Sequence, residues 1–471
     1  MGLEGGEVEK YAPIFRKIAK RILKTINRRR EHMSGRIFGD NRLKSMVIVL
    51  IGTLLTVGLA FSILVASPGE AEEPIRILGT VAFSGAAGNI GPAYDRAMRL
   101  AVEEINAAGI LGFSGIEYKV IDTETKPSVL KRKLSREVGT WKPDVMGGAA
   151  LETTISPLCV EAPRYKIPTF VGGHLSMSKY LPPGEVPVSK WVVYYGYADY
   201  FAGQLAGRFF EEMGAKKVAL IGGDYDWGYS NGMGLKAYWE KNGKPFEISP
   251  VIYTPLDKTD YTTEVLIIKE EKPDAIFCPY TGAGWFSVAK QLRDAGAMPR
   301  IMLYGTTYSN MGGAKITGEY GAENIYTLAD HDPTSEAWKE FVKKWKTKYG
   351  EKAYPEAYTN NYYQVIYWIK EVYEKAGTKD PDVIIDLMQK TSFQNVCISP
   401  MGPLDGYGNN KGAKGAVVKF VPGSSDLDPT FGLHPELVRV YETSDITMLE
   451  ILDELKGFKK LESGEEYERA R

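Results

Sequence analysis

The chain has 471 residues and a formal net charge of −1. This length allows two domains after any targeting segment is set aside, and the balanced charge excludes the basic footprint of a nucleic-acid-binding protein. The three cysteines, Cys159, Cys278 and Cys397, are far apart and form no metal-type pair. Histidine is also scarce, so we expect no metal site and three buried thiols, although a disulfide between two of them is compatible with the spacing.

An uncharged apolar run spans Met46–Ala66 and has the length of a membrane-crossing helix, which needs about 20 such residues. Arginines and lysines precede the run and glutamates follow it. The positive-inside rule then places residues 1–45 in the cytoplasm and the chain after Ser67 outside. Two interpretations remain open: an uncleaved anchor, or a secretory signal cleaved near Ala66–Ala71. The length of the run favours the anchor.

The segment Tyr11–Asn27 places isoleucines at successive steps of four residues, with lysine and arginine at many of the other positions. This pattern predicts a basic amphipathic helix on the cytoplasmic surface of the membrane. The alternative is an untranslated or disordered extension. A start at Met33 is also compatible with the sequence and would give a leader of more ordinary length.

The stretch Ile75–Gly109 predicts the first βα unit of a parallel sheet. A short buried strand over Ile75–Ala82 is followed by a Gly- and Ser-bearing loop over Phe83–Gly91. Pro92 in the first turn and Gly109 just past the end are typical of the helix that follows. Because ligands bind beyond the carboxyl ends of parallel strands, the loop is a candidate wall of a binding site.

Short apolar runs alternate with amphipathic helices along the rest of the chain, which predicts a parallel α/β layer. The pattern restarts after a crossover near Trp191–Asp199. In the second half, a strand over Lys217–Gly222 is followed by a loop over Gly223–Gly228 and a helix from Asn231. We therefore expect a second lobe with the architecture of the first.

Several motifs occur in a characteristic order. The first helix ends in A-V-E-E-I-N-A-A-G at Ala101–Gly109, and a buried strand at Asp274–Phe277 leads to K-Q-L-R-D-A-G at Lys290–Gly296. Further on, Met401–Gly406 reads M-G-P-L-D-G. In this order the motifs resemble the extracytoplasmic solute-binding proteins of ABC importers, of the branched-chain amino-acid (Leu/Ile/Val) type. The resemblance covers the chain from Ile75 to Val440.

The resemblance implies a periplasmic-binding-protein type I fold, with two doubly wound parallel-sheet lobes joined by a three-strand hinge, here preceded by an N-terminal transmembrane helix. It also implies that a ligand held by both lobes shifts the protein toward a closed state, which docks on a permease without any chemical reaction. The expected parts are a cytoplasmic extension over 1–45, a membrane helix over 46–66, lobe 1 over 75–195 plus 331–397, lobe 2 over 196–330 plus 398–445, and a charged tail over 446–471.

By the same resemblance, the ligand contacts loops that follow the strand ends. In the family, backbone amides and a hydroxyl of the loop after the third strand hold a carboxylate; here Leu151 and Glu152 replace the usual serine, and Thr153 or Thr154 could substitute for it. The resemblance assigns ligand contacts in lobe 1 to Phe83, Ser84, Ala149, Ala150, Leu151, Gly173, His174 and Ser176, and in lobe 2 to Trp227, Tyr280, Thr281 and Thr306.

The last of these loops departs from the family pattern. Amino-acid binders usually supply an acidic residue there for the ligand ammonium, but Gly305–Asn310 reads G-T-T-Y-S-N. An unpaired ammonium in a closed cleft is costly. Either Asp224 or Asp226 compensates, or the ligand is not an α-amino acid. In the second case an amide, a urea-like compound or an organic or aromatic carboxylate fits, and His174 helps to hold a carboxylate.

We therefore expect the substrate-binding protein of an ABC importer, with a small amino acid, amide or carboxylic acid as ligand, permease subunits as partners, and no cofactor. We expect it at the cell membrane with a single span and an extracytoplasmic binding domain, or periplasmic or secreted if the leader is cleaved. The alternative is the ligand-binding ectodomain of a membrane sensor or regulator. An enzyme is not expected, because P-loop, H-E-x-x-H and G-x-S-x-G patterns are absent.

Overall fold

The computed structural model describes residues 73–85, 88, 90–149, 152–171, 190–194, 196, 199–255, 258–279, 285–305, 324–355, 358–404, 410–423 and 433–442. The expected cytoplasmic extension, membrane helix and charged tail lie outside these residues and stay predictions. Within the described ranges, no helix combines the length and the apolar character that a membrane span requires.

In the described part of the chain, five parallel strands form the first sheet, in the order β2-β1-β3-β4-β5. Six of the seven residues of β1 are buried, as expected of a strand in a parallel sheet covered on both faces. The elements are β1 (Ile75–Val81), α3 (Gly91–Ala108), β2 (Ile116–Asp122), α4 (Pro127–Thr140), β3 (Val145–Gly147), α5 (Glu152–Tyr165), β4 (Thr169–Val171) and β5 (Val192–Tyr194).

The second sheet has the order β12-β11-β10-β9-β8-β6-β7 among the described residues. Its strands are parallel except β11, which runs antiparallel to β10 and β12. The expected parallel sheet is therefore extended by a mixed edge. The elements are α6 (Asp199–Glu212), β6 (Lys217–Gly223), α7 (Asp226–Lys241), β7 (Glu247–Thr254), α8 (Thr262–Glu271), β8 (Ala275–Cys278), α9 (Trp285–Asp294), β9 (Ile301–Tyr304), β10 (Ile325–Ala329), β11 (Lys414–Pro422) and β12 (Leu433–Glu442).

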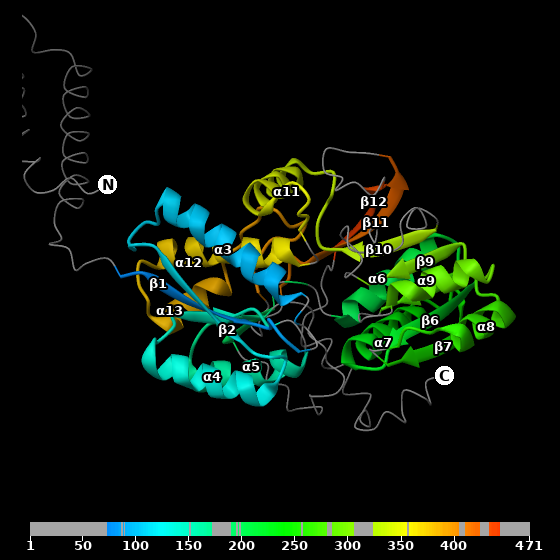
Figure 1. Ribbon diagram of the computed structural model, residues 1–471, viewed down its shortest axis with the longest axis horizontal. Helices are drawn as coiled ribbons and strands as arrows, with labels where there is room; N and C mark the ends of the chain where they lie inside the picture. The colour runs from blue at the N-terminus through cyan, green and yellow to red at the C-terminus, as the bar shows by residue number, and fades with distance from the viewer. Residues whose placement is uncertain are drawn as a thin grey trace, which may run out of the picture. The chain divides into compact units, whose positions relative to one another are not determined.

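Three helices that follow β10 in the sequence return to the first sheet. They are α11 (Glu336–Tyr349), α12 (Thr359–Ala376) and α13 (Pro381–Met388). Their apolar side chains, with Trp338, Trp345 and Trp368 almost fully buried, join one hydrophobic core with β1 and α3. In Figure 1, α12 accordingly lies beside α3. The chain thus passes between the two sheets after β5, after β10 and before β11.

The predicted first βα unit is confirmed. Helix α3 has proline in its first turn and ends at Gly109, whose φ is +84°. Gly91 packs so closely against the end of β1 that an added Cβ would lie 1.7 Å from the carbonyl oxygen of Ala82. Glycine is therefore required there by a close backbone approach, which fixes where the loop after β1 ends.

Candidate functional site

Four of the predicted ligand residues, Phe83, Ser84, Ala149 and Trp227, lie within the described residues. The others lie outside them: Ala150, Leu151, Gly173, His174, Ser176, Tyr280, Thr281 and Thr306. The ligand-binding role of the whole set stays a prediction, but the structure shows how the four described residues are held.

The loop after β1 is braced by an aspartate that ends the neighbouring strand. The N–H of Phe83 donates to Oδ1 of Asp122 over 2.9 Å, and the hydroxyl of Ser84 donates to Oδ2 over 3.1 Å. Partial burial raises the pKa of Asp122. The hydrogen bonds that its carboxylate accepts from the N–H groups of Glu124 and Phe83 and from the Ser84 hydroxyl outweigh this effect, so the pKa lies below its ordinary value. Phe83 as a whole remains 38% exposed, which leaves the residue accessible to a ligand.

Sequence reasoning missed Asp122. An available signal was its position as the last residue of Tyr118–Asp122, which the sequence predicts to be the second strand, because the strands that flank β1 carry their last residues to the same edge. The pairing of Val81 with Asp122 at the ends of β1 and β2 brings the carboxylate to that edge.

The loop after β3 has a backbone that only glycine allows. A Cβ at Gly147 would lie 2.0 Å from the carbonyl oxygen of Phe170, and Gly148 has a φ of +107°. Ala149 is buried, and the Tyr362 hydroxyl donates to the carbonyl oxygens of both Gly148, over 3.3 Å, and Ala149, over 3.1 Å. The side chain of Ala149 is therefore not available to a ligand, and any contact by this residue must come from its backbone.

In the second lobe, the expected loop over Gly223–Gly228 is partly helical. Helix α7 begins at Asp226, so Trp227 lies in its first turn rather than in a loop. The glycines that suggested a loop instead permit close packing, because a Cβ at Gly228 would lie 2.1 Å from the carbonyl oxygen of Gly223.

Trp227 covers the end of β9 and is only 6% exposed. A Cβ at Gly305 would lie 2.3 Å from the indole Cη2 atom, so glycine is what lets the ring fit. The carbonyl oxygen of Gly305 accepts a hydrogen bond from the Thr327 hydroxyl over 2.9 Å, and the carbonyl oxygen of Trp227 accepts one from Asn231 Nδ2 over 2.8 Å. The ring thus lies directly before the loop that contains the predicted ligand residue Thr306.

Asp224, one of the two carboxylates expected to compensate for the missing acid, is exposed, and its Oδ1 accepts a hydrogen bond from the Tyr229 hydroxyl. The side chain of Asp226 lies outside the described set. The exposed carboxylate of Asp224 is therefore accessible to the ammonium of an amino-acid ligand, as the first of the two sequence-based explanations requires.

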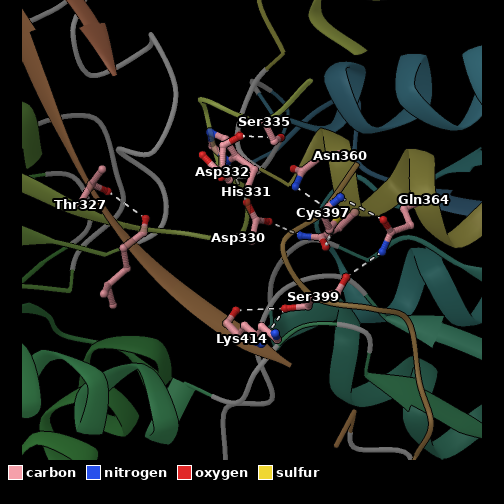
Figure 2. Close-up of polar contacts among 12 residues, drawn as sticks. Thr327, Asp330, His331, Asp332, Ser335, Asn360, Gln364, Cys397, Ser399 and Lys414 are labelled. Carbon is pink, nitrogen blue, oxygen red and sulfur yellow. Dashed lines mark hydrogen bonds and ion pairs between the residues drawn. The ribbon is translucent and has the colours of Figure 1, made fainter. Parts of the chain in front are cut away.

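A buried polar network joins two of the three passages between the sheets (Figure 2). Asn361 Nδ2 donates to Oδ2 of Asp330, just after β10, and the carbonyl oxygen of Asp330 accepts from the N–H of Ile398 over 3.0 Å. The Cys397 thiol donates to Oδ1 of Asn361 over 3.1 Å and accepts from Nδ2 of Asn360 over 3.3 Å. Burial raises the pKa of Cys397 well above its ordinary value, so the thiol keeps the proton that it donates.

Gln364, one turn further along α12, holds the passage that precedes β11. Its Oε1 accepts from the N–H groups of Asn395, over 2.8 Å, and Cys397, over 2.9 Å, and its Nε2 donates to the carbonyl oxygen of Ser399 over 3.0 Å. The Ser399 hydroxyl in turn accepts from the N–H of Lys414 over 2.6 Å and donates to its carbonyl oxygen over 3.0 Å. Figure 2 shows these residues in line from α12 to the start of β11.

The imidazole of His331 lies beside this network. It stacks on the indole of Trp338, with ring centroids 3.8 Å apart and an interplanar angle of 19°, and its Nδ1 lies 3.3 Å from Oδ1 of Asp330. The stacking on Trp338 anchors the residues that follow β10 to helix α11, and the Asp330 carboxylate orients the imidazole.

All three cysteines are buried and unpaired with one another, as predicted. Burial raises the pKa of Cys159 to about 12 and that of Cys278 well above its ordinary value. Among the described residues, no cluster of histidine, cysteine, aspartate and glutamate could hold a metal ion.

A model of the family described as "Periplasmic binding protein" matches residues 74–418. A solute-binding protein of an ABC transporter from Rhodopseudomonas palustris BisB5, in complex with 3,4-dihydroxybenzoic acid, superposes with a TM-score of 0.67 at 19% identity, over 79% of this chain and 99% of that one. The branched-chain amino-acid transporter substrate-binding protein LivJ of Streptococcus pneumoniae, in complex with isoleucine, gives 0.63 at 20% identity, over 78% and 99%. Another R. palustris solute-binding protein, in complex with benzoate, gives 0.64 at 18% identity, over 79% and 98%. At these identities the similarity shows the fold.

Proposed function

The chain belongs to the periplasmic binding protein family, and we propose that it is the extracytoplasmic solute-binding component of an ABC importer. It binds a small amino acid, amide or organic acid between its lobes and delivers that ligand to a permease. Catalysis has no part in this role, because ligand capture requires only a change in the balance between open and closed states.

The observation that carries this proposal is a pair of braced loops at the same edge of the first sheet. Strands β1 and β3 are neighbours in that sheet. The loop after β1 is held by the Asp122 carboxylate, and the loop after β3 is held by the Tyr362 hydroxyl. A crevice beyond the carboxyl ends of parallel strands is where open α/β sheets bind ligands, and rigid loops there lower the entropic cost of binding.

Lobe closure is supported by the connections between the sheets. Asn361 and Gln364 of α12 fix the segments at Asp330 and Cys397 to the first core. The ladder between β10 and β11 then begins at the pairing of Ala329 with Ala416. Bending is therefore expected where the α12 network meets this ladder, at the Ala329–Asp330 junction and around Gly415, because hinges are a few element-terminal residues.

The charged groups of a ligand must find partners in the binding loops, and this requirement limits the classes of ligand that we propose. The related proteins above bind isoleucine, benzoate and 3,4-dihydroxybenzoic acid. All three ligands carry a carboxyl group, but only isoleucine also carries an ammonium. Since Gly305–Asn310 contains no acidic residue, we propose a ligand with a carboxylate or amide group, and an amino acid only if Asp224 or Asp226 pairs with its ammonium.

We further propose that residues 46–66 anchor the protein in the cell membrane, with the binding domain on the extracytoplasmic side. The support is the uncharged run and its flanking charges. Protease treatment of intact spheroplasts tests this arrangement: the binding domain should be digested while an epitope tag at the amino terminus is protected. A mature protein that starts near residue 72 would instead demonstrate a cleaved leader.

The main test is a ligand screen of the full chain in detergent micelles by thermal shift. The compounds are isoleucine, leucine, benzoate, 3,4-dihydroxybenzoate, their primary amides, and urea. A ligand at 1,000 times its Kd should stabilise the folded protein by about 4 kcal/mol. Hits are then titrated by calorimetry and checked for chemical change. Binding without turnover supports the proposal, whereas conversion of the bound compound, or no binding by any of these compounds, refutes it.

A further inference from the structure

Helix α4 concentrates positive charge on its exposed side. Residues 126–142 contain six lysines and arginines and one glutamate, although the whole chain has a net charge of −1. Lys131, Arg132 and Arg136 are exposed, and Arg132 and Arg136, four residues apart, lie on the same side of the helix. Lys131 and Arg132 form no ion pair with any described residue. Solute binding at the strand ends makes no use of these cations.

The acidic side chains of this region are hidden beneath the cations. Among the described side chains of α4 and α5, only Glu137 and Glu161 are acidic, and they are 2% and 7% exposed. The Glu137 carboxylate pairs with Lys119 and Arg136. The Glu161 carboxylate pairs with Arg164 over 3.2 Å. The described part of this surface therefore presents positive charge to the solvent and almost no negative charge.

Helix α5 extends the positive surface. It packs beside α4 (Figure 1). Val160 lies one turn before Arg164 on the same side of α5, and with 52% of its surface exposed it adds apolar area. The exposed cations of both helices and of the residues that follow them form one basic face, which consists of Lys131, Arg132, Arg136, Lys142, Arg164 and Lys166.

The ends of α4 and α5 lie at the edge of the first sheet where its strands begin. Trp141 precedes β3 by four residues, and Tyr165 precedes β4 by four residues. Because these strands are parallel to β1, the chain also enters the sheet at this edge. Lys119 Nζ lies 5.6 Å from the Trp141 ring centroid, and Arg164 Cζ lies 5.5 Å from that of Tyr165. Half-exposed aromatic rings beside cations are typical of surfaces that contact lipid headgroups.

The chain before β1 brings this edge close to the membrane in the anchored form proposed above. Eight residues, 67–74, separate the apolar run from β1. An extended chain spans at most about 3.6 Å per residue, so β1 begins within about 30 Å of the bilayer. Lys379 Nζ holds the end of this linker, because it donates to the carbonyl oxygen of Pro74 over 2.5 Å and pairs with Asp144 over 3.0 Å. A short linker raises the effective concentration of headgroups at the basic face.

We propose that the basic face is a second binding surface, which lies on the headgroups of anionic lipids and holds the first lobe against the membrane. The inference goes beyond solute binding, and it uses the proposed anchor only to bring the face near the bilayer. The candidate ligand loops follow the carboxyl ends of the strands, at the opposite edge of the sheet, so the lipid contact leaves them uncovered. An acidic protein segment is the competing partner, but it would make no use of Val160 or of the two rings.

The experiment uses the full chain in nanodiscs of phosphatidylcholine, alone or mixed with an equal part of phosphatidylglycerol. A fluorophore on the Ser135→Cys variant, at an exposed position of α4, reports contact through quenching by spin-labelled headgroups. The Thr347→Cys variant is the matched control, because Thr347 is an exposed hydroxyl on α11, which packs against α3 and α12 away from α4 (Figure 1). The native cysteines are buried and take up no label. We expect stronger quenching for Ser135→Cys than for the control in anionic discs only, and its loss at about 1 M salt.

Removal of charge gives a second readout. Lys131→Gln combined with Arg132→Gln should lower the equilibrium constant for contact about thirtyfold, which is about fivefold for each cation near an anionic surface. The control is Lys343→Gln combined with Lys352→Gln, two exposed lysines on and just after α11, and it should leave that constant within about twofold because these cations lie far from the basic face.

The inference is overturned if both labelled variants are quenched equally in anionic discs, or if the Lys131→Gln and Arg132→Gln pair leaves the quenching unchanged. A chain that does not enter the discs refutes the anchor alone. The contact is then measured by sedimentation with vesicles of the same two compositions, and an absence of binding to the anionic vesicles overturns it. Binding of poly-glutamate without any contact to anionic lipid would identify an acidic protein segment as the partner and would overturn the inference as well.

Discussion

Replacing Gln364 by leucine tests how strongly α12 holds the connection between the two sheets. The amide side chain makes three hydrogen bonds, to the N–H groups of Asn395 and Cys397 and to the carbonyl oxygen of Ser399. Leucine fills a similar volume and makes none of them. Asn395 is exposed, so water can replace its lost partner, whereas Cys397 and Ser399 are buried and their backbone groups are left without one.

The expected loss follows from these two orphaned groups. An unsatisfied buried donor or acceptor costs about 1–3 kcal/mol, so Gln364→Leu should lower the free energy of unfolding by about 4 kcal/mol. Urea denaturation of the full chain in detergent micelles, followed by circular dichroism, measures this value. The control is Gln389→Leu, because the Gln389 amide makes a solvent-accessible hydrogen bond of 3.3 Å to the carbonyl oxygen of Lys190, whose loss should cost under about 1 kcal/mol.

A second substitution at the same site separates the donor from the acceptor. Gln364→Glu keeps an acceptor for the two N–H groups but, when ionised, presents negative charge to the Ser399 carbonyl. The protonated acid can donate to that carbonyl, so the pKa of the new carboxyl should be raised in the folded state. A group protonated in the folded state and ionised in the unfolded one makes stability fall as pH rises above about 4.3. A loss under about 1 kcal/mol in Gln364→Leu, or no pH dependence in Gln364→Glu, would refute the reasoning.

Three further predictions concern the loops and the thiols. Because the pKa of the Asp122 carboxyl is lowered in the folded protein, its contribution to stability is present above the unfolded pKa of about 3.9 and is lost as the pH falls from there through the folded pKa. The stability difference between wild type and Asp122→Asn should therefore shrink in urea titrations from pH 7 to pH 3. A constant difference would contradict the assignment. Gly305→Ala places a Cβ against the Trp227 ring, so tryptophan emission should shift and the melting temperature should fall; an unchanged spectrum would show that the ring is elsewhere. The three buried thiols, with raised pKa values, should react with a thiol reagent at pH 8 only after addition of denaturant, and rapid labelling of the native protein would argue against their burial.

Local chemistry made much of the fold predictable. Proline inside the first turn and glycine just past the end locate α3, because each residue restricts or frees its own backbone. Short apolar runs mark the strands since a parallel sheet buries both of its faces. The family and its two-lobed α/β architecture follow from the order of such local signals. Glycine was less decisive: Gly228 suggested a loop, yet it lies in α7, where close packing against Gly223 excludes a side chain.

Less of the candidate site than of the fold could be predicted from the sequence. Sequence order predicts that loops after strands gather at one edge, and the family resemblance assigned ligand contacts in those loops, among them Phe83, Ser84, Ala149 and Trp227. It does not reveal what holds those loops. Asp122 lies 39 positions from Phe83, and the amphipathic pattern of α12 marks a buried face without indicating what that face contacts.

By itself, the sequence determined the elements, the family and the edge of the sheet where we propose that a solute binds, because propensity, periodicity and order along the chain are local properties. Only the tertiary structure decided that Tyr362 supports a loop 213 positions away and that Gln364 joins α12 to the strand entering the second sheet. Hydrogen bonds of this kind form where packing brings distant segments within about 3 Å of each other, and no pattern of neighbouring residues specifies that meeting.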